Sequence, residues 1–348
     1  VRDDHPFLAC TEAGLGHVRV PASDLSSPLQ RERLQLLREQ GVNVTAFWLW
    51  RENLPLRQLT QEHVDILDAI EVQVTGAVMP EQTCLAALAE CHEILGKTVV
   101  LTPYLAREVR PGKYHPRARI GYKVDEISQL HRHLEALDTE LDRVICHLDD
   151  TDSPIRIVRT LSEHLPSSRI RGYDLVAELA GTDEQSHANR AAEAVFAAAA
   201  DPNLRIFISP FVDLDRTNDV SHGLLDRLSN PRPAYHVVRS LNSLLFAGCD
   251  RQKGVRLDGK LRTAASYTMF PGSRGSYRYV LITAASVGSR ESRNPIIQAI
   301  SESLPALDTT LDLFDVVNAA SHLQVELSNL DAALADSDGP WLLRFLLR

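Results

Sequence analysis

The feature of this sequence that most constrains its fold is a regular alternation between residues 15 and 245 of short β-like runs and longer amphipathic stretches. This alternation is typical of a parallel sheet whose strands are connected by helices. The runs with strand character are His17–Pro21, Val42–Trp48, Val72–Met79, Val99–Tyr104, Val144–Asp149, Ile170–Glu178 and Arg205–Asp213. The helical stretches between them are Leu29–Gln40, Cys84–Leu95, Val124–Leu137, Pro154–His164 and His187–Ala200.

The two faces of several of these runs differ in character. In Val144–Asp149, the apolar Val144 and Leu148 alternate with His147 and Asp149. A parallel strand in an open, doubly wound sheet is buried on both faces and is apolar throughout. In a barrel, the apolar face meets the helices and the other face points into the lumen, where polar groups gather at the carboxyl ends of the strands. The sequence therefore predicts an α/β fold, a (β/α)8 TIM barrel, with the open sheet as the alternative.

Seven candidate strands leave the predicted barrel one strand short. The missing strand is either the weak run Pro6–Thr11 or lies upstream of this sequence. The N-terminus, Val1–Asp4, has neither a signal peptide nor an initiating methionine. We therefore expect a barrel that is truncated at its start.

A change of pattern near Phe246–Lys253 predicts a domain boundary, with the barrel at residues 1–248 and a small β-sandwich at 249–348. Turn signals stand at Asp258-Gly259 and Pro271-Gly272. The remaining segments with strand character are a hairpin of Leu261–Phe270 and Ser276–Thr283, followed by Leu311–Val316, Leu323–Leu327 and Trp341–Leu346.

Composition excludes several classes of function. With 37 Lys and Arg against 46 Asp and Glu, the net charge is -9, so no basic field is present to attract nucleic acid or an anionic membrane. No apolar run is long enough to span a bilayer. The 5 cysteines include no CxxC pair, which indicates free buried thiols and a reducing, cytoplasmic location. No cofactor is predicted.

One segment carries a resemblance to a known family. Asp213 is followed by the sequence His-Gly-Leu-Leu-Asp at 222–226 and by Asn-Pro-Arg-Pro-Ala-Tyr at 230–235. This order resembles the last strand and helix of retaining clan-A glycoside hydrolases, which are (β/α)8 barrels often followed by a β-sandwich. Gly16–Pro21, with Arg19, is similar to their second strand, and Val144–His147 to their sixth. The resemblance follows the element order over residues 15–246 and is specific only in 205–246.

The resemblance implies two catalytic carboxylates. The general acid/base glutamate of that family ends the fourth strand and the nucleophile ends the seventh, positions that fall on Glu81 and Glu178. Arg19 is expected to hold Glu178 ionised, because a nearby opposite charge favours a carboxylate. Pro80 departs from the family, which has Asn immediately before the acid/base. That asparagine binds the sugar 2-hydroxyl, so in this sequence either the contact has moved or the site no longer cleaves glycosides.

Structural roles are open for the same residues. Glu81 also suits the first turn of a helix, where the helix dipole favours an acid. Asp174 is expected to be a buried acid paired with Arg19 or Arg171. His147 and Asp149 lie two residues apart on one strand face, and are either a hydrogen-bonded pair in the lumen or the start of a metal site.

Aromatic side chains at predicted strand ends are candidate platforms for sugar rings, although core packing is the commoner role of Trp and Tyr. The predicted substrate-binding set is Arg19, Trp48, Trp50, Tyr104, His147, Asp149, Phe211 and Asp213, with Tyr114 and Tyr122 as further aromatics nearby.

Three functions remain open from the sequence. The first is a retaining glycoside hydrolase that acts on β-linked glycosides through Glu178 and Glu81. The second is a non-catalytic barrel that binds a glycan or a partner and accompanies an upstream domain. The third is a metal-dependent sugar isomerase or epimerase with Glu81, His147, Asp149 and Glu178 as ligands.

Overall fold

A computed structural model describes most of the chain, namely residues 4–50, 59–106, 118–149, 152–164, 169–179, 183–216, 219–247, 254–257, 262–264, 267–284, 300, 310–334 and 338–346. The chain divides into two compact units. The first contains residues 1–152, 156–178 and 203–209. The second contains residues 153–155, 179–202 and 210–348.

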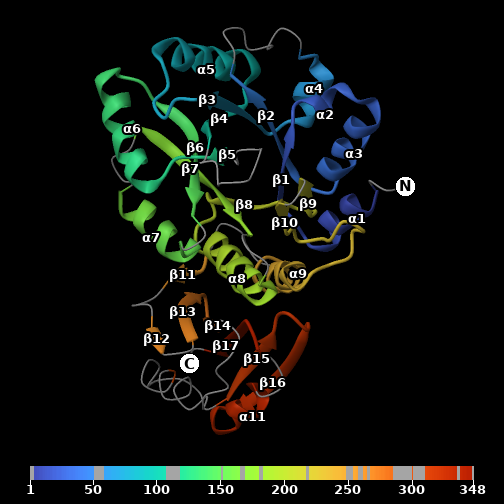
Figure 1. Cartoon of the computed structure of the whole chain (residues 1–348). Coiled ribbons are helices and arrows are strands. Elements are labelled where there is room, and N and C mark those ends of the chain that lie inside the picture. Colours follow the sequence, from blue (N-terminus) through green and yellow to red (C-terminus); the bar gives the residue numbers. More distant parts are fainter. Residues whose placement is uncertain are drawn as a thin grey trace. The chain divides into compact units, whose positions relative to one another are not determined.

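The first unit is built around a parallel sheet (Figure 1). Its strands, in their spatial order, are β1 (His17–Pro21), β2 (Asn43–Leu49), β3 (Ala69–Thr75), β4 (Thr98–Ala106), β6 (Leu141–Leu148), β7 (Ile170–Glu178) and β8 (Arg205–Ser209). A short strand, β5 (Ala118–Ile120), pairs antiparallel with β4. The edge strands β1 and β8 approach each other, but no ladder of backbone hydrogen bonds joins them in the described part of the chain. The sheet is therefore a nearly closed barrel.

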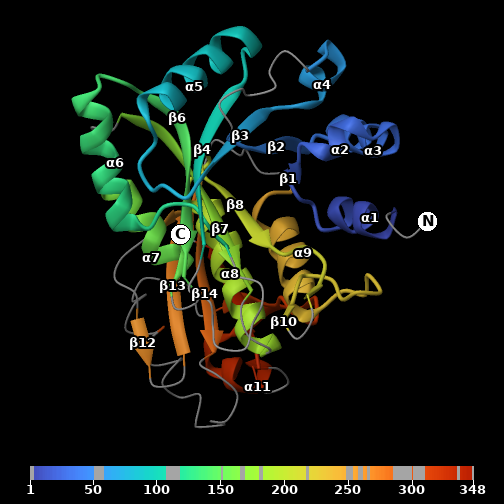
Figure 2. The ribbon, with the colours of Figure 1, turned by 45° about the horizontal axis from the view of Figure 1, so that its top comes forward.

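Helices flank the outside of these strands (Figures 1 and 2). They are α1 (Asp4–Glu12), α2 (Ser23–Ser26), α3 (Pro28–Glu39), α4 (Gln61–Ile66), α5 (Gln82–Leu95), α6 (Val124–Ala136) and α7 (Pro154–His164). Pro28 begins α3, where a missing N–H costs nothing. Gly96 ends α5 with φ of 60°, a left-handed conformation that suits glycine.

The register of the strands separates a lumen face from a helix face. Residues paired across neighbouring strands share a face, so Phe47, Glu71 and Val100 lie on one side. The apolar residues of that side form a buried cluster of Ala69, Val100, Ile145, Val176 and Phe207. The lumen therefore has a packed apolar filling, and polar side chains are inserted among it.

The second unit contains α8 (Glu184–Ala200), α9 (Pro233–Leu245), the hairpin of β9 (Leu214–Arg216) with β10 (Asp219–Ser221), and an antiparallel sheet. The strands of the sheet, in spatial order, are β11 (Arg256–Leu257), β13 (Tyr267–Arg274), β14 (Tyr277–Ala284), β17 (Trp341–Leu346), β15 (Thr310–Asp315) and β16 (Ala320–Glu326), with β12 (Arg262–Ala264) also paired to β13. A 3-10 turn (Leu327–Asn329) and α11 (Leu330–Leu334) follow β16.

Both faces of this sheet are covered by apolar residues. On one face, Trp341 and Leu343 pack with Leu330 and Leu334 of α11. On the other, a Cβ at Gly272 would lie 3.3 Å from the Phe196 ring of α8, so glycine allows that helix to pack closely. The predicted TIM barrel with a C-terminal β-sandwich is confirmed as a fold class.

Several expected elements differ in detail. Pro6–Thr11 is helical within α1, because the run lacks the alternation that a strand requires. The third strand is Ala69–Thr75 and ends before Gly76, which has φ of 77°. Pro271-Gly272 lies inside β13, and the hairpin turns at Gly275 instead. The turn expected at Asp258-Gly259 lies outside the described residues.

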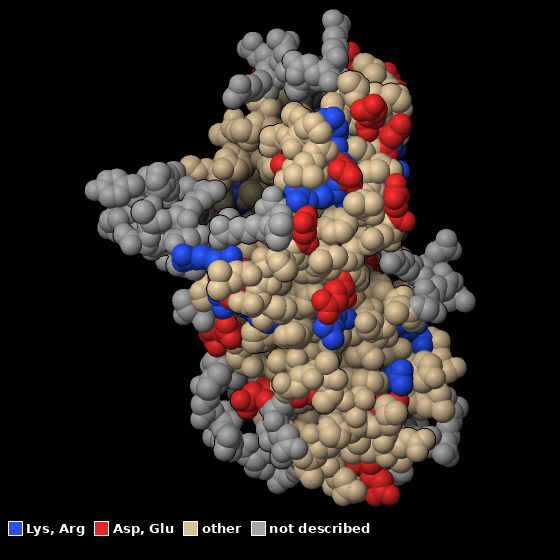
Figure 3. Space-filling view, turned by 90° about the vertical axis from the view of Figure 1, so that its right-hand side faces the viewer, with Lys and Arg blue, Asp and Glu red and all other residues tan. Residues whose placement is uncertain are grey.

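No helix in the described part of the chain is long and apolar enough to span a bilayer. The face drawn in Figure 3 carries basic and acidic side chains in small, interspersed groups. This distribution agrees with the modest net charge.

Candidate functional site

The carboxyl ends of parallel strands meet at one end of a barrel, where the loops that follow them build the active sites of barrel enzymes. Register places several predicted site residues there on the lumen face: Arg19 of β1, Tyr104 of β4, His147 of β6 and Glu178 of β7. The geometry around each of these residues differs.

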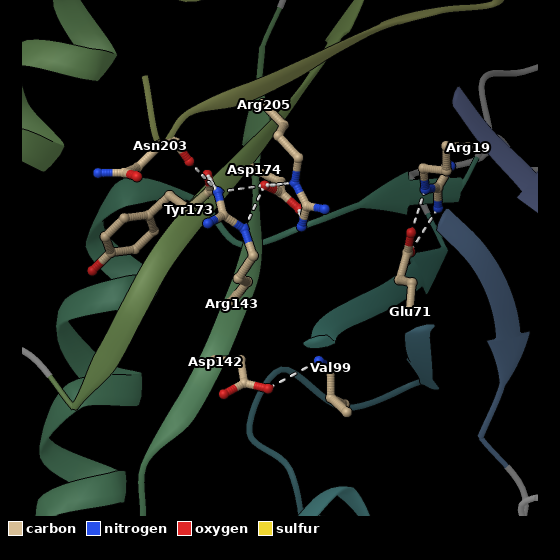
Figure 4. Close-up of polar contacts among 9 residues, drawn as sticks. All are labelled: Arg19, Glu71, Val99, Asp142, Arg143, Tyr173, Asp174, Asn203 and Arg205. Carbon is tan, nitrogen blue, oxygen red and sulfur yellow. Dashed lines mark hydrogen bonds and ion pairs between the residues drawn. The ribbon is translucent and has the colours of Figure 1, made fainter. Parts of the chain in front are cut away.

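Arg19 is bound by an acid that the sequence analysis did not single out, Glu71 of β3 (Figure 4). Arg19 Nη2 lies 2.7 Å from Glu71 Oε1, and Nε binds Oε2. Gln73 Nε2 also donates to Glu71 Oε1, at 2.9 Å. Glu71 is fully buried, and the guanidinium of Arg19 lies 4.5 Å from the ring centre of Phe47. Arg19 is therefore held by Glu71.

A second ion-pair network lies among the strands β6, β7 and β8 (Figure 4). Arg143 Nε and Arg205 Nε each lie 2.8 Å from Asp174 Oδ1. Arg143 Nη2 also donates to the carbonyls of Tyr173 and Asn203, at 2.6 and 2.5 Å. Asp174 is therefore a buried, ion-paired acid, as expected. Its partners are Arg143 and Arg205, and not Arg19 or Arg171.

Glu178 is the last residue of β7 and is partly buried. It shares the lumen parity of Asp174 and Val176, and its partner on β8 is Ser209. It therefore stands at the carboxyl end of its strand, closer to the mouth of the barrel than Asp174.

Glu81 is placed differently. It lies beyond the end of β3, is exposed, and occupies the N-cap position of α5 without a capping hydrogen bond from its side chain. The preceding Pro80 is buried, and its carbonyl lies 3.0 Å from His133 Nε2 of α6. The backbone immediately before Glu81 is thus hydrogen-bonded to α6.

His147 joins two segments at the carboxyl end of β6. Its buried side chain places Nδ1 3.2 Å from the carbonyl of Ile120, and Nε2 3.3 Å from Asp149 Oδ1. Asp149 Oδ2 lies 3.0 Å from Lys123 Nζ. In the described part of the chain, no group of three or more His, Cys, Asp or Glu residues could hold a metal ion. The geometry is that of a hydrogen-bonded pair.

The predicted aromatic residues are divided by the register. Trp48 pairs with Val72 and faces the helices, whereas its neighbour Phe47 faces the lumen beside Glu71. The backbone N–H of Trp50 donates to the carbonyl of Gln73 at 2.7 Å. Tyr122 is fully buried, and Tyr114 lies outside the described residues.

In the second unit, Asp213 is bound by Arg232, the N-cap residue of α9. Arg232 Nη2 and Nε lie 2.6 and 3.2 Å from the two Asp213 oxygens, and the N–H of Gly223 donates to Oδ1 at 2.7 Å. Arg232 Nη1 reaches Glu184 Oε1 of α8 at 2.6 Å. Burial alone would raise the pKa of Asp213, but the hydrogen bonds from Arg232 and Gly223 lower that pKa below its ordinary value.

Further contacts within residues 205–246, the segment that carries the family resemblance, determine the shape of its backbone. A Cβ at Gly223 would lie 2.7 Å from the backbone of Val212, so the close approach requires glycine. Asp226 Oδ1 accepts from the N–H groups of Leu228 and Asn230, both at 2.8 Å. The residues that carry the resemblance thus shape the connection between β8 and α9.

Sequence reasoning missed Glu71 and Phe47. Glu71 stands between the apolar residues Ile70 and Val72, and an acid at that position is the signal that would have identified it. Phe47 lies on the same face of β2 as Thr45. The nearby Trp48 and Trp50 were the more conspicuous aromatic residues in the sequence.

Comparisons with known proteins give a structural answer only. No family model and no curated protein matches the sequence. Among solved structures, a family 39 glycoside hydrolase from the gut symbiont Bacteroides cellulosilyticus WH2 aligns with a TM-score of 0.58 at 9% identity, over 99% of this chain and 78% of that one. A noncanonic maltogenic alpha-amylase, AmyB from Thermotoga neapolitana, aligns with a TM-score of 0.47 at 8% identity, over 98% and 93%.

The first of these alignments extends over both the barrel and the β domain. The low identity means that the likeness concerns architecture, and residue roles do not transfer with it. The chain therefore shares the architecture of the first of these structures, a TIM barrel followed by a C-terminal β-sandwich.

Proposed function

We propose that this protein is a retaining glycoside hydrolase that acts on β-linked glycosides, with Glu178 as the nucleophile and Glu81 as the general acid/base. The observation that carries the proposal is the position of Glu178, a carboxylate on the lumen face at the last residue of β7. A barrel enzyme places its reacting groups at this end of the strands.

The chemistry assigns each glutamate a different task. The ionised Glu178 attacks the anomeric carbon and forms a glycosyl ester, while protonated Glu81 gives its proton to the leaving oxygen. Water, activated by Glu81 as a base, then cleaves the ester. A retaining enzyme needs the two carboxyl groups about 5–5.5 Å apart. Glu81 stands on the loop that follows β3, so the proposal requires that loop to turn the side chain toward the mouth of the barrel.

Substrate contacts are proposed at the same end of the strands. Trp50 and Tyr104 supply aromatic faces for sugar rings, and His147 with Asp149 supplies hydrogen-bonding groups. Phe211, also a predicted contact, belongs to the second unit. The role of Arg19 changes from that expected, because its guanidinium is bound by Glu71. Asp213 is likewise bound, by Arg232, so we assign it to holding its loop rather than to contacting sugar.

The decisive experiment compares wild type with Glu178→Ala, Glu81→Ala and an exposed control, Glu62→Ala, on aryl β-glycosides whose leaving groups differ in acidity. Loss of the nucleophile should abolish turnover. Added azide should restore it and give a product of inverted configuration, because the small anion attacks from the side that Glu178 vacated. Loss of the acid/base should slow substrates with poor leaving groups most. Turnover by Glu178→Ala without azide would refute the assignment.

A second candidate, a barrel that binds glycans without cleaving them, is favoured by the surroundings of Glu81. The residue is exposed, and the preceding proline carbonyl is fastened to His133 of α6. Pro80 also lacks the amide that the resemblance calls for. Calorimetric binding of oligosaccharides, with no reducing sugar released over days across a broad panel, would support this candidate over the hydrolase.

A further inference from the structure

Arg232 links the loop after β8 to the start of α8, the helix that follows β7 in the chain. Asp213 lies in the loop after β8, and Glu184 is the first residue of α8, the helix that follows β7. Arg232 reaches one carboxylate with Nη2 and the other with Nη1, each at 2.6 Å. All three residues belong to the second unit.

The link is strong for physical reasons. Asp213 has a side chain that is only 4% exposed, and Arg232 binds both of its oxygens through Nε and Nη2. Bidentate arginine–carboxylate pairs fix orientation as well as distance. The pKa of Arg232 is raised above its ordinary value by the hydrogen bond to Asp213, although burial acts in the opposite direction. The guanidinium therefore stays charged throughout the usable pH range.

Asp213 extends the link into its own loop. Its Oδ1 accepts from the N–H of Gly223, and the backbone N–H of Asp213 donates to the carbonyl of Leu225 at 2.9 Å. Arg232 N–H donates to the carbonyl of Leu224 at 2.9 Å. Movement of Arg232 would thus disturb both the loop after β8 and the first turn of α8.

We propose that Arg232 is a positioning residue, which couples the loop after β8 to the first turn of α8, the helix that follows the proposed nucleophile along the chain. The inference rests on the proposed function for its catalytic consequence. The coupling itself is a property of the fold and is measured separately.

The test uses the full-length protein with Arg232→Met, the conservative Arg232→Lys and the control Arg227→Met, which removes an exposed guanidinium from the same loop. Hydrogen–deuterium exchange is followed at the amides of Gly223 and Leu225, and at Gln185 and Ser186 in α8. In Arg232→Met, we expect the exchange rate at both places to rise about tenfold. Local opening then costs less free energy, because no shared ion pair has to be broken. In Arg232→Lys, part of the protection from exchange should return, because lysine keeps the positive charge but lacks the planar guanidinium that binds two oxygens at once.

If wild type hydrolyses a glycoside, Arg232→Met should lower kcat by about 10- to 100-fold with KM nearly unchanged, because misplacement of reacting groups costs rate. An unchanged kcat would overturn the positioning role. If wild type hydrolyses nothing, the proposed function fails, and the exchange data alone decide the coupling. Exchange that rises in only one of the two places, or equally in Arg227→Met, would overturn it.

Discussion

Arg19 of β1 and Glu71 of β3 form a two-pronged ion pair inside the barrel, with Gln73 as a third member (Figure 4). The carboxylate is fully buried, and the guanidinium side chain is 13% exposed. The pair places two opposite charges among apolar lumen residues, and removing either one leaves a charge without compensation.

The first prediction concerns this pair. Glu71→Gln and Arg19→Met should each lower the free energy of unfolding by about 3–5 kcal/mol, because one buried charge remains unpaired. The double variant Arg19→Met/Glu71→Met should be more stable than either single variant. Urea unfolding of all four proteins measures this. A loss below about 1 kcal/mol in both single variants, the size of an exposed ion pair, would contradict the account.

The second prediction concerns Gly172 of β7. A Cβ there would lie 2.8 Å from Arg143 Cζ, so the guanidinium that binds Asp174 occupies the space an alanine would need. Gly172→Ala should lower stability by about 1–3 kcal/mol, the usual cost of overpacking. The substitution should cost much less in an Arg143→Met background. Equal losses in the two backgrounds would show that Arg143 does not cause the strain.

The third prediction concerns acid unfolding. The pKa of Asp213 is lowered in the folded protein, so its contribution to stability is complete above its unfolded pKa, whose ordinary value is 3.8, and is lost as pH falls through the folded value. Asp213→Asn should cost about 1.5–3 kcal/mol near neutral pH, as hydrogen bonds to a charged group do. The difference from wild type should shrink on acidification. A difference that is independent of pH between neutrality and acid would contradict the assignment.

The fourth prediction concerns the cysteines. Burial raises the pKa of the Cys10 and Cys146 thiols to about 12, and burial is also the main cause that raises Cys84 and Cys91 to about 11. In a Cys249→Ser variant, the folded protein should not react with a thiol reagent at pH 8, because the thiolate is the reactive form. Four thiols should react after unfolding. Fast modification of the folded variant would contradict the buried placement.

Strand order and the lumen parity could be predicted from the sequence. His17–Pro21, Ile170–Glu178 and Trp341–Leu346 are strands with the expected bounds. In the two barrel strands, polar residues such as Arg19 and Glu178 mark the lumen side. Pro271-Gly272 resembles a turn in the sequence but lies inside β13, because that glycine allows close packing against Val255 and Phe196.

The partners inside the lumen could not be predicted. Which arginine meets which acid depends on the stagger between strands, and a single sequence does not contain the stagger. Asp174 is thus paired across β6 and β8, and Arg19 reaches over β2 to Glu71. The position of Glu81 was hard to predict for a related reason. The third strand is displaced toward the N-terminus of its expected range, which leaves Glu81 beyond the strand on the cap of α5.

The central claim, that Glu178 is the nucleophile of a retaining glycosidase, is tested most directly by trapping the glycosyl-enzyme. A 2-deoxy-2-fluoro β-glycoside with a good leaving group, of the sugar that wild type cleaves best, slows hydrolysis of the ester. Intact mass and peptide mapping then locate the label. The account predicts one sugar per chain, on the peptide that contains Glu178. A label on another carboxylate, or inactivation without a covalent adduct, would contradict it.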